Sequence, residues 1–255
     1  MQTVRTSDHD GGVRVLTLAR PPANAIDETL LTELGLALNA AQADPAVRAV
    51  VLTGAGRFFS GGFDLAAPRL DAAAASRLRI LYRDLHAELL GFPKPTLAMV
   101  NGHAIAGGFV LALTCDYRLG VEGDYRVGLN EVTVGAGFPR TAAEIVRLRL
   151  SHARANELML GAALYPAREA VRLGLVDELL APDDFTATAL RRAARLGNHP
   201  RAAYVDAKLG LVAEALERIA RESDADGDHT DAVWRDPESR AARRKQREKL
   251  GIASG

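Results

Sequence analysis

Hydrophobic residues follow two different periods near the start of the chain. Residues 13–18 alternate apolar and polar side chains, which predicts a strand with one buried face. After Asp27, which we expect to cap a helix, apolar residues recur at helical spacing until Asp44, where the following Pro45 disfavours helical geometry. The apolar face of this predicted helix consists of Leu30, Leu31, Leu34, Leu38 and Ala41.

The alternation of strand and helix continues along the chain. Apolar runs at 47–53 and 96–100 predict two more strands, and the segment between them predicts a helix over 71–90 with leucines on one face. The leucines of that face are Leu78, Leu81, Leu85 and Leu89. Strands that alternate with helices are typical of a parallel sheet with right-handed crossovers, so the pattern predicts an α/β fold.

The second half of the chain is predicted to be mostly helical. A short buried helix is expected over 109–114, followed by strands at 116–121 and 125–129, and beyond Thr141 the pattern is almost wholly helical. In one of these helices the apolar seam is formed by Val205, Leu209, Val212, Leu216 and Ile219. We therefore expect a core sheet followed by a helical C-terminal region.

Two strand ends in this pattern run directly into glycines. The strand at 96–100 is followed by Asn-Gly-His-Ala-Ile-Ala-Gly-Gly at 101–108, and the run at 49–54 leads to Phe-Ser-Gly-Gly-Phe-Asp-Leu at 59–65, with a helix expected to begin near Asp64. A helix leaves its first N–H groups unpaired and carries partial positive charge there, and glycine lets an oxygen come close to them. Together the two strand ends indicate two backbone donors directed at one oxyanion.

These motifs, in this order, resemble those of the crotonase superfamily of enoyl-CoA hydratases and isomerases. The resemblance runs roughly from Val13 to Val176, and it includes flanking motifs at 20–25, 47–54, 93–96 and 115–116. It implies a crotonase-like β-β-α spiral core, expected over residues 1–195. It also implies a C-terminal helical region, expected over residues 196–255, that completes the site and packs trimers.

The resemblance also implies which residues act on the substrate, an acyl-CoA thioester. The oxyanion donors are expected to be the N–H groups of Phe63 and Gly107, which stabilise the charge that collects on the thioester oxygen as an enolate forms. The Phe63 ring is expected to trim the acyl pocket, and Asp64 to cap the helix that follows. The implied substrate-binding positions are Ala23, Ala25, Gly61, Gly62, Asp64, Leu65, Gly108 and Val110.

The acid–base residues depart from the hydratase pattern of that superfamily. Hydratases use two glutamates to position and activate water, and the first of these positions is Val110 here. The second is matched by Glu131, although the loop before it is about one residue longer. One carboxylate suffices to move a proton from one carbon to another, as in Δ3,Δ2-enoyl-CoA isomerases, whereas efficient water addition needs two. The sequence therefore favours isomerisation with Glu131 as the single acid/base.

Other chemically capable residues are expected to be structural. Asp116 is interpreted as a hydrogen-bond acceptor at a strand start, with a second catalytic carboxylate as the alternative, and His103 as a packed histidine that points away from the site. Asp224, Asp226 and Asp228 are not followed by the glycine and glutamate of a calcium loop, so they predict a solvated connector. No histidine spacing indicates zinc, and no cofactor is implied beyond the coenzyme A of the substrate.

Composition narrows the class of protein further. A chain of 255 residues can bury one sizeable core, and 32 basic residues balance 32 acidic ones, which favours neither nucleic acid nor a membrane as partner. Cys115 is the single cysteine and the first residues lack a signal-peptide core, so a soluble cytoplasmic protein is expected. A basic C-terminal segment predicts a solvated helix face, or alternatively a contact with the 3′-phosphate of CoA: Arg240, Arg243, Arg244, Lys245, Arg247 and Lys249.

The sequence thus predicts a crotonase-fold enzyme, a homotrimer or hexamer, that acts on enoyl-CoA. Two alternatives stay open at this point. One is a true 2-enoyl-CoA hydratase in which Asp116 or bound water replaces the missing glutamate. The other is a non-catalytic subunit that binds acyl-CoA.

Overall fold

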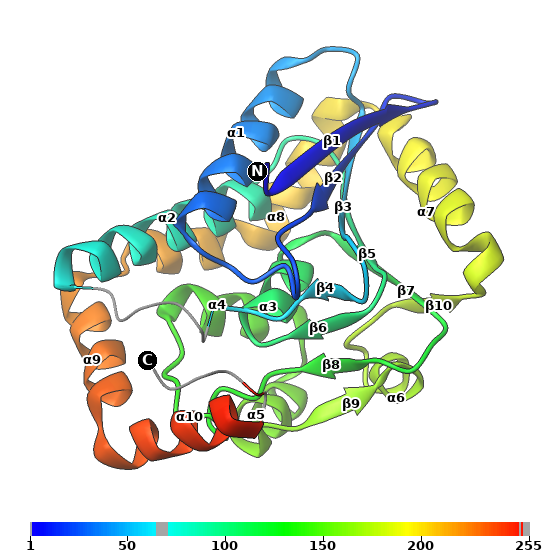
Figure 1. The fold of residues 1–255 in the computed structure, drawn as a ribbon. Coiled ribbons are helices and arrows are strands. Elements are labelled where there is room, and N and C mark those ends of the chain that lie inside the picture. Colours follow the sequence, from blue (N-terminus) through cyan, green and yellow to red (C-terminus); the bar gives the residue numbers. More distant parts are fainter. Residues whose placement is uncertain (1, 65–70, 250, 252–255) are drawn as a thin grey trace.

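The computed structural model describes residues 2–64, 71–249 and 251, and it contains a six-stranded sheet beside a four-stranded one (Figure 1). In the larger sheet β1 is antiparallel to β2 and the other neighbours are parallel. Its strands, in spatial order, are β1 (Val4–His9), β2 (Val13–Leu18), β3 (Ala49–Gly54), β5 (Thr96–Val100), β7 (Tyr117–Val121) and β10 (Glu178–Leu180). The smaller sheet consists of β4 (Phe58–Ser60), β6 (His103–Ile105), β8 (Arg126–Gly128) and β9 (Leu164–Pro166).

Three strands of the larger sheet are each followed directly by a strand of the smaller one. β3 leads to β4, β5 to β6 and β7 to β8, so each turn of the chain adds one strand to each sheet. A helix follows each pair: α2 (Ala72–Leu90), α3 (Gly107–Thr114) and α4 (Arg140–Arg149). This repeated strand-strand-helix unit is the β-β-α spiral that the sequence predicted.

Two of the helices, α1 (Glu28–Ala43) and α2, begin where an aspartate side chain accepts from an N–H group of the first turn. Asp27 accepts from the N–H of Leu30 at 2.8 Å, and Asp71 accepts from that of Ala74 at 2.7 Å. The remaining helices are α5 (His152–Gly161), α6 (Ala167–Arg172), α7 (Pro182–Gly197), α8 (Arg201–Ala220), α9 (Asp224–Arg235) and α10 (Pro237–Lys249). Across the described residues, none of these helices has the length and apolar character to cross a membrane.

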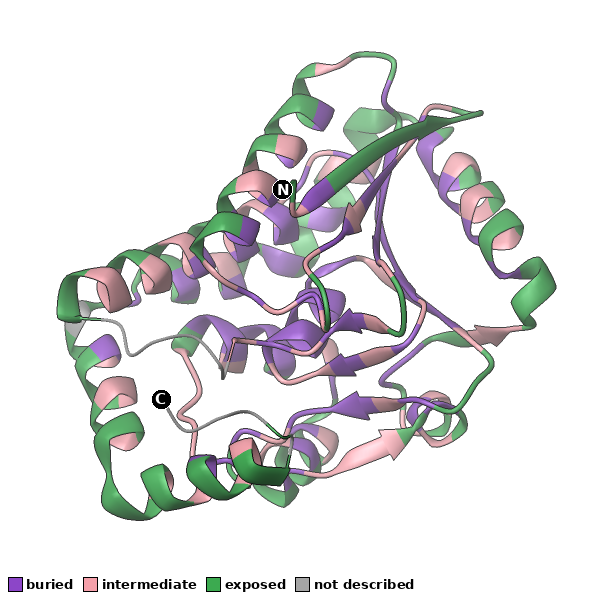
Figure 2. Cartoon of the chain, in the orientation of Figure 1, coloured by how far each residue is buried: buried purple, intermediate pink, exposed green. Residues whose placement is uncertain are grey.

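The six-stranded sheet separates two apolar clusters. Along β3, Val50 and Leu52 face the larger cluster, which includes side chains of α1, α2, α3, α4 and α8. Ala49 and Val51 face the other way, toward Phe185 and its neighbours on α7. Figure 2 shows the inner strands of the sheet as buried, while β1 and the outer surfaces of the helices are exposed. Burial on both faces explains why this strand is a continuous apolar run.

Five of the described strands were not predicted from the hydrophobic pattern: β1, β4, β6, β9 and β10. β1 has a single buried residue, Val4, and is held at the edge of the sheet by its antiparallel pairing with β2. β9 and β10 are three-residue strands in the region expected to be wholly helical, and they pair with β8 and β7. Such short strands depend on a distant partner, so no local hydrophobic pattern indicates them.

The apolar seam predicted for α8 differs from the observed one. Val212 and Ile219 are buried as expected, but Leu209 is 42% exposed and Lys208 is buried instead. Lys208 donates to the carboxylate of Asp116 at 3.0 Å, which offsets part of the cost of burying its charge. The spacing of hydrophobic residues could not indicate that Lys208 is buried, because its burial depends on the ion pair with Asp116.

The acidic segment at 224–228 is not the solvated connector that the sequence predicted. It forms the first turns of α9, where Ser223 and Asp226 exchange hydrogen bonds between side chain and backbone in a capping box. Asp226 also pairs with Arg140 of α4 at 2.5 Å, and this partner holds the pKa of Asp226 well below its usual range. Carboxylates are stabilising at a helix N-terminus, which explains the acidic sequence.

Candidate active site

The two glycine-rich strand ends meet backbone to backbone. Gly62 has a φ of +82°, and a Cβ atom there would lie 3.1 Å from the nitrogen of Gly107 and 2.9 Å from the oxygen of Ile105. A Cβ atom at Gly108 would lie 2.3 Å from the oxygen of Ser60. Glycine alone permits this approach, which brings the end of β4 against the start of α3.

Two backbone N–H groups at this junction have no acceptor among the described residues. Phe63 forms a parallel bridge with Ile26, in which the Ile26 N–H donates to Gly62 and the Asp64 N–H donates to Ile26. The Phe63 N–H itself donates to no described residue. Gly107 is the first residue of α3, and the helical bonds begin at the N–H of Phe109. The helix terminus adds partial positive charge beside Gly107, so the pair of N–H groups suits an oxyanion.

The turn that presents Gly107 is strained. Ala106 has φ +54° and ψ −132°, a conformation that costs a non-glycine residue on the order of 1–3 kcal/mol. The Ala106 N–H donates to the oxygen of Gly128 at 2.9 Å, and its oxygen accepts from Phe109 and Val110. These bonds hold the backbone in the orientation that leaves the next N–H group without an acceptor.

A loop before α1 supports the first glycine segment. The buried side-chain amide of Asn24 donates to the oxygen of Phe58 at 2.8 Å, and the Gly61 N–H donates to the oxygen of Ala23 at the same distance. Ala23 and Ala25 are both partly buried in this loop. The structure therefore brings these two sequence-predicted positions to the glycine segment.

Asp64 is expected to cap a helix whose first residues lie outside the described ranges, so that cap stays a prediction. The Asp64 carboxylate pairs with Arg20 at 2.6 Å, and Arg20 also pairs with Asp27, the cap of α1. The next described helix, α2, takes its cap from Asp71. Asp64 thus ties the glycine segment to the start of α1, while Leu65 lies outside the described residues.

The Phe63 ring, together with Tyr82 and His86 of α2, forms an aromatic wall that reaches Gly107. The Phe63 ring lies 3.6 Å from where a Cβ atom of Gly107 would be, and its centroid is 5.2 Å from that of Tyr82. Tyr82 packs in turn on His86 at 3.9 Å, and burial lowers the pKa of His86 to about 4, so this ring is neutral. Tyr82 was not predicted as a site residue, because its spacing on α2 is that of an ordinary buried residue.

Glu131 is a buried carboxyl in the turn after β8. It is 8% exposed, and its Oε2 has no hydrogen-bond partner among the described residues. Burial raises the pKa of Glu131 to about 7, against the opposing effect of the N–H groups of Glu131 and Asn130. Burial raises the pKa of Tyr82, and the charge of Glu131 raises it further, so Glu131 lies within electrostatic range of the aromatic wall.

Comparisons with known proteins identify the family to which the chain belongs. The model of the enoyl-CoA hydratase/isomerase family matches residues 8–251. The chain belongs to the enoyl-CoA hydratase/isomerase family, within the crotonase superfamily. Among its relatives, a probable enoyl-CoA hydratase of Mycolicibacterium paratuberculosis is 33% identical over 228 residues, which are 86% of this chain and 87% of that one. A putative enoyl-CoA hydratase of Thermus thermophilus is 38% identical over 178 residues, which are 68% of this chain and 69% of that one.

Solved structures of both hydratases and isomerases resemble this family member. The human mitochondrial Δ3-Δ2-enoyl-CoA isomerase has a TM-score of 0.92 and 27% identity, with 100% of both chains covered. An enoyl-CoA hydratase of Mycobacterium ulcerans has a TM-score of 0.80 and 30% identity, with 91% of this chain and 99% of that one covered. The protein is therefore a crotonase-fold enzyme of this family, a lyase or an isomerase.

In this crotonase-family enzyme the first of the two hydratase glutamate positions is apolar. Val110 is fully buried in α3. Asp116, the alternative carboxylate, accepts hydrogen bonds from the Thr96 N–H, the Tyr204 hydroxyl and the Lys208 ammonium. These contacts lie where β5 and β7 begin. The expected oxyanion donors lie elsewhere in the chain, because Phe63 follows β4 and Gly107 follows β6. Asp116 is therefore a structural acceptor, as predicted.

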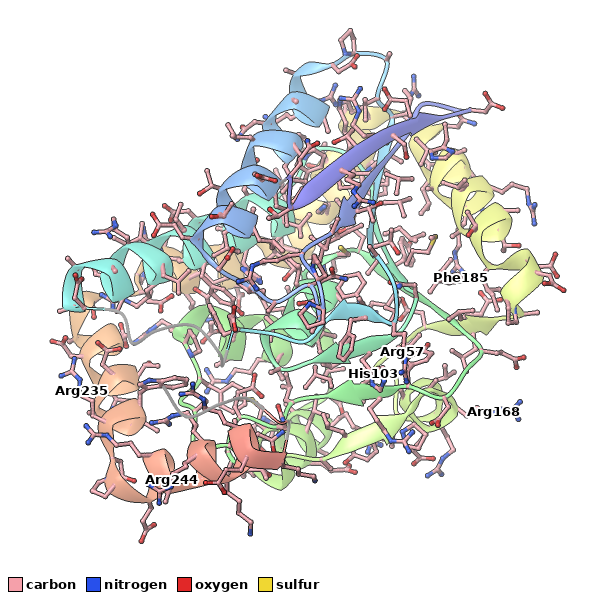
Figure 3. The ribbon with its side chains drawn as sticks, viewed as in Figure 1. Arg57, His103, Arg168, Phe185, Arg235 and Arg244 are labelled. Carbon is pink, nitrogen blue, oxygen red and sulfur yellow. The ribbon has the colours of Figure 1, made fainter. Side chains whose placement is uncertain are left out.

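His103 and Cys115 lie outside the candidate site of the crotonase-family enzyme. The Arg126 N–H donates to Nδ1 of His103 at 3.1 Å, and Figure 3 shows His103 beside Arg57, on the side away from α9 and α10. Cys115 is fully buried, which raises its pKa to about 12 and keeps the thiol protonated. Nowhere in the described ranges do His, Cys, Asp and Glu side chains gather in a group that could hold a metal ion.

The C-terminal helices pack against the loop that carries Glu131. Arg243 donates to the oxygens of Gly135 and Trp234, and its guanidinium lies 4.0 Å from the centre of the Trp234 ring. A Cβ atom at Gly135 would lie 2.5 Å from the backbone of α10. The prediction of a solvated basic face is therefore wrong for Arg243, because its side chain is buried. It is confirmed for Arg244, which is exposed on the outer side of α10 (Figure 3).

Proposed function

We propose that this enzyme moves the double bond of an enoyl-CoA thioester, with Glu131 as its single acid/base and the N–H groups of Phe63 and Gly107 as its oxyanion hole. The state of Glu131 carries the proposal: its carboxyl is buried, has a pKa of about 7 and keeps one oxygen without a partner among the described residues. Val110 supplies no second carboxyl for water addition.

The proposed reaction needs one base. The Glu131 carboxylate removes a proton from C2 of a 3-enoyl-CoA, and the electron pair delocalises over the alkene and the thioester as a dienolate. The N–H groups of Phe63 and Gly107 stabilise the charge on the thioester oxygen. The protonated Glu131 then delivers its proton to C4, which yields the 2-enoyl-CoA and restores the carboxylate. A pKa near neutrality suits both transfers.

Hydration is the alternative reaction. It requires one group to take a proton from water and another to position the water or protonate the product, and Asp116 is already bonded to Thr96 and Lys208. A hydratase would therefore have to use ordered water in place of the second glutamate.

We also infer the setting of the reaction. The substrate is an acyl-CoA thioester, with no cofactor beyond its coenzyme A and with neither nucleic acid nor membrane as partner. Leu209 and Leu211 of α8 are 42% and 73% exposed, which supports their burial in a homotrimer or hexamer. The single, unpaired Cys115 supports a cytoplasmic location. The division into a core at 1–195 and a helical region at 196–255 stays a prediction.

The direct test is to assay 2-enoyl-CoA and 3-enoyl-CoA of equal chain length side by side. We expect isomerisation of the 3-enoyl ester to exceed hydration of the 2-enoyl ester by at least about tenfold, because one carboxylate is missing for the latter. Hydration as fast as isomerisation at every chain length would favour the hydratase. Binding of esters without any exchange of the α-proton would favour a non-catalytic subunit.

The activity is also expected to depend on pH through Glu131. This carboxyl must be ionised to remove a proton, and burial raises its pKa to about 7. Below that pH, kcat/KM for a 3-enoyl-CoA should fall about tenfold per pH unit, and above it the value should level off. A pH–rate profile measured with the unmodified protein checks this. A flat profile between about pH 5 and 8 would show that Glu131 is not the base.

Replacing Val110 with glutamate is expected to raise hydration relative to isomerisation by at least about tenfold, because it restores a second carboxyl near the first turn of α3. Val110 is fully buried, so the added group also lowers stability. Val110→Gln is the matched control, since it adds a side chain of similar size without an ionisable group. A folded Val110→Glu protein with the hydration ratio of Val110→Gln would contradict the explanation based on one glutamate.

A further inference from the structure

A cavity of about 300 Å³ lies beside the residues that precede β3 and β5. Three segments line it: residues 45–48 lead into β3, residues 93–95 lead into β5, and residues 196–201 connect α7 to α8. The oxyanion donors, by contrast, follow β4 and β6, the strands that come after β3 and β5 in the chain. The cavity is therefore separate from the proposed catalytic groups, and the reaction leaves it unexplained.

Every charged side chain that lines this cavity is basic. Arg48, Lys94 and Arg201 contribute to its wall together with His199, and no aspartate or glutamate does. Within the described part of the chain, none of the three cations pairs with a carboxylate. By contrast, Arg14 pairs with Asp8 and Arg20 pairs with Asp27.

The two arginines are positioned by backbone carbonyls. Arg48 donates its Nε–H to the oxygen of Gly197 at 2.9 Å, and Arg201 donates its Nε–H to the oxygen of Pro93 at 3.3 Å. These bonds fix the orientation of each guanidinium and engage one of its five N–H donors. The outer donors of both groups are left for a ligand.

Lys94 adds a buried positive charge. It is 2% exposed, and its ammonium donates to the oxygens of Ala41 at 2.6 Å and Asp44 at 2.7 Å, which engages two of its three protons. Burial lowers the pKa of Lys94 and the charge of Arg201 lowers it further, while the charge of the Asp44 carboxylate, which is bonded to Arg14, has a smaller opposing effect. An anion in the cavity would further offset the cost of burying this positive charge.

The N-terminus of a helix adds to the positive electrostatic potential of the cavity. The long helix α8 begins at Arg201, and Pro200 before it provides no side-chain cap. His199, Pro200 and Arg201 all line the cavity, so the uncapped first turn borders it. Unpaired N–H groups and the helix dipole favour an anion at such a place.

We propose that this cavity binds a phosphate group, either the free ion or the phosphate monoester of a compact metabolite. Guanidinium groups bind phosphate through two parallel N–H bonds, and Arg48 and Arg201 provide two such groups beside the Lys94 ammonium. The cavity volume lies at the lower limit for small-molecule sites, which fits a compact ligand.

Calorimetric titration of inorganic phosphate into the full chain, at constant ionic strength, tests the proposal. We expect saturable binding to one site that weakens at least about tenfold in Arg48→Gln and in Arg201→Gln, since each change removes a charge-assisted contact. Arg191→Gln is the matched control: Arg191 is an exposed arginine of α7 that bonds to Thr188 and does not line the cavity. Its affinity should equal that of the wild type.

The source of the phosphate is resolved by titrating glycerol 3-phosphate in the same way. Tighter binding than inorganic phosphate identifies a monoester ligand, and equal binding identifies the free ion. Thermal unfolding verifies that all variants are folded, and their isomerase activity without phosphate should be unchanged. Absence of saturable heat up to about 10 mM phosphate, or equal affinity in wild type, Arg48→Gln and Arg201→Gln, would overturn the proposal.

Discussion

Replacing Glu131 with glutamine is expected to lower isomerisation by at least about 100-fold while leaving the affinity for acyl-CoA nearly unchanged. Glutamine preserves the shape of the side chain but cannot accept the C2 proton. The pKa of about 7 for Glu131 indicates that the carboxylate is available at neutral pH, so its removal abolishes the proposed base. Single-turnover exchange of the α-proton, measured beside calorimetric affinity for a saturated acyl-CoA, separates the two effects.

Glu88→Gln provides a matched control for that variant. Glu88 is a partly buried carboxyl on α2 whose Oε1 also has no hydrogen-bond partner among the described residues, and burial raises the pKa of Glu88 as well. It belongs to neither the oxyanion hole nor the Glu131 loop, so Glu88→Gln should retain wild-type exchange. Wild-type exchange in Glu131→Gln would remove Glu131 from the mechanism.

Replacing Gly107 with valine is expected to lower the rate constant by about 10²–10³-fold, comparable to the loss of one oxyanion-hole donor. The methyl groups of valine extend toward Phe63 and Ile26, whose atoms lie 3.4 to 3.6 Å from the position of a Cβ atom. They push the thioester oxygen and the Phe63 backbone away from each other. Because the donor bonds strengthen as the enolate forms, kcat should fall more than the affinity for a saturated acyl-CoA.

Gly107→Ala is the control that distinguishes chemistry from folding. A single Cβ atom at Gly107 makes ordinary contacts, so alanine should keep the fold and most of the activity. Gly108→Ala, by contrast, places a Cβ atom 2.3 Å from the oxygen of Ser60 and should destabilise the protein. Equal losses of affinity and rate in a folded Gly107→Val protein would contradict transition-state stabilisation at this position.

Local physics accounts for the elements that the sequence predicted correctly. The five apolar residues expected on one face of α1 are all buried, and α1 starts after the Asp27 cap and ends before Asp44 as predicted. Helical spacing, a capping aspartate and a following proline all act within a few residues of each other, so a single chain segment contains the information. The strand pattern of β2 and β5 is local in the same sense.

The candidate site was predictable in outline because its chemistry is carried by short motifs. The glycines at 61–62 and 107–108 indicated two donors, and Glu131 was found through its place in a resembled motif. Tyr82 was missed because nothing within its own helix distinguishes it from a core residue. The ion pair of Asp64 with Arg20 was not predicted, because Arg20 lies 44 positions earlier in the chain.

The sequence by itself determined the alternation of strands and helices, the glycine-lined turns, the absence of a glutamate at position 110 and the identity of the one matching carboxyl. These properties depend on neighbouring residues or on residue type alone. Tertiary structure decided that β4 and α3 touch, that Glu131 is buried enough for a pKa of about 7, and that Arg243 holds the loop beside it. Burial and ion pairing depend on which distant segments exclude water from a group, and no local pattern contains that information.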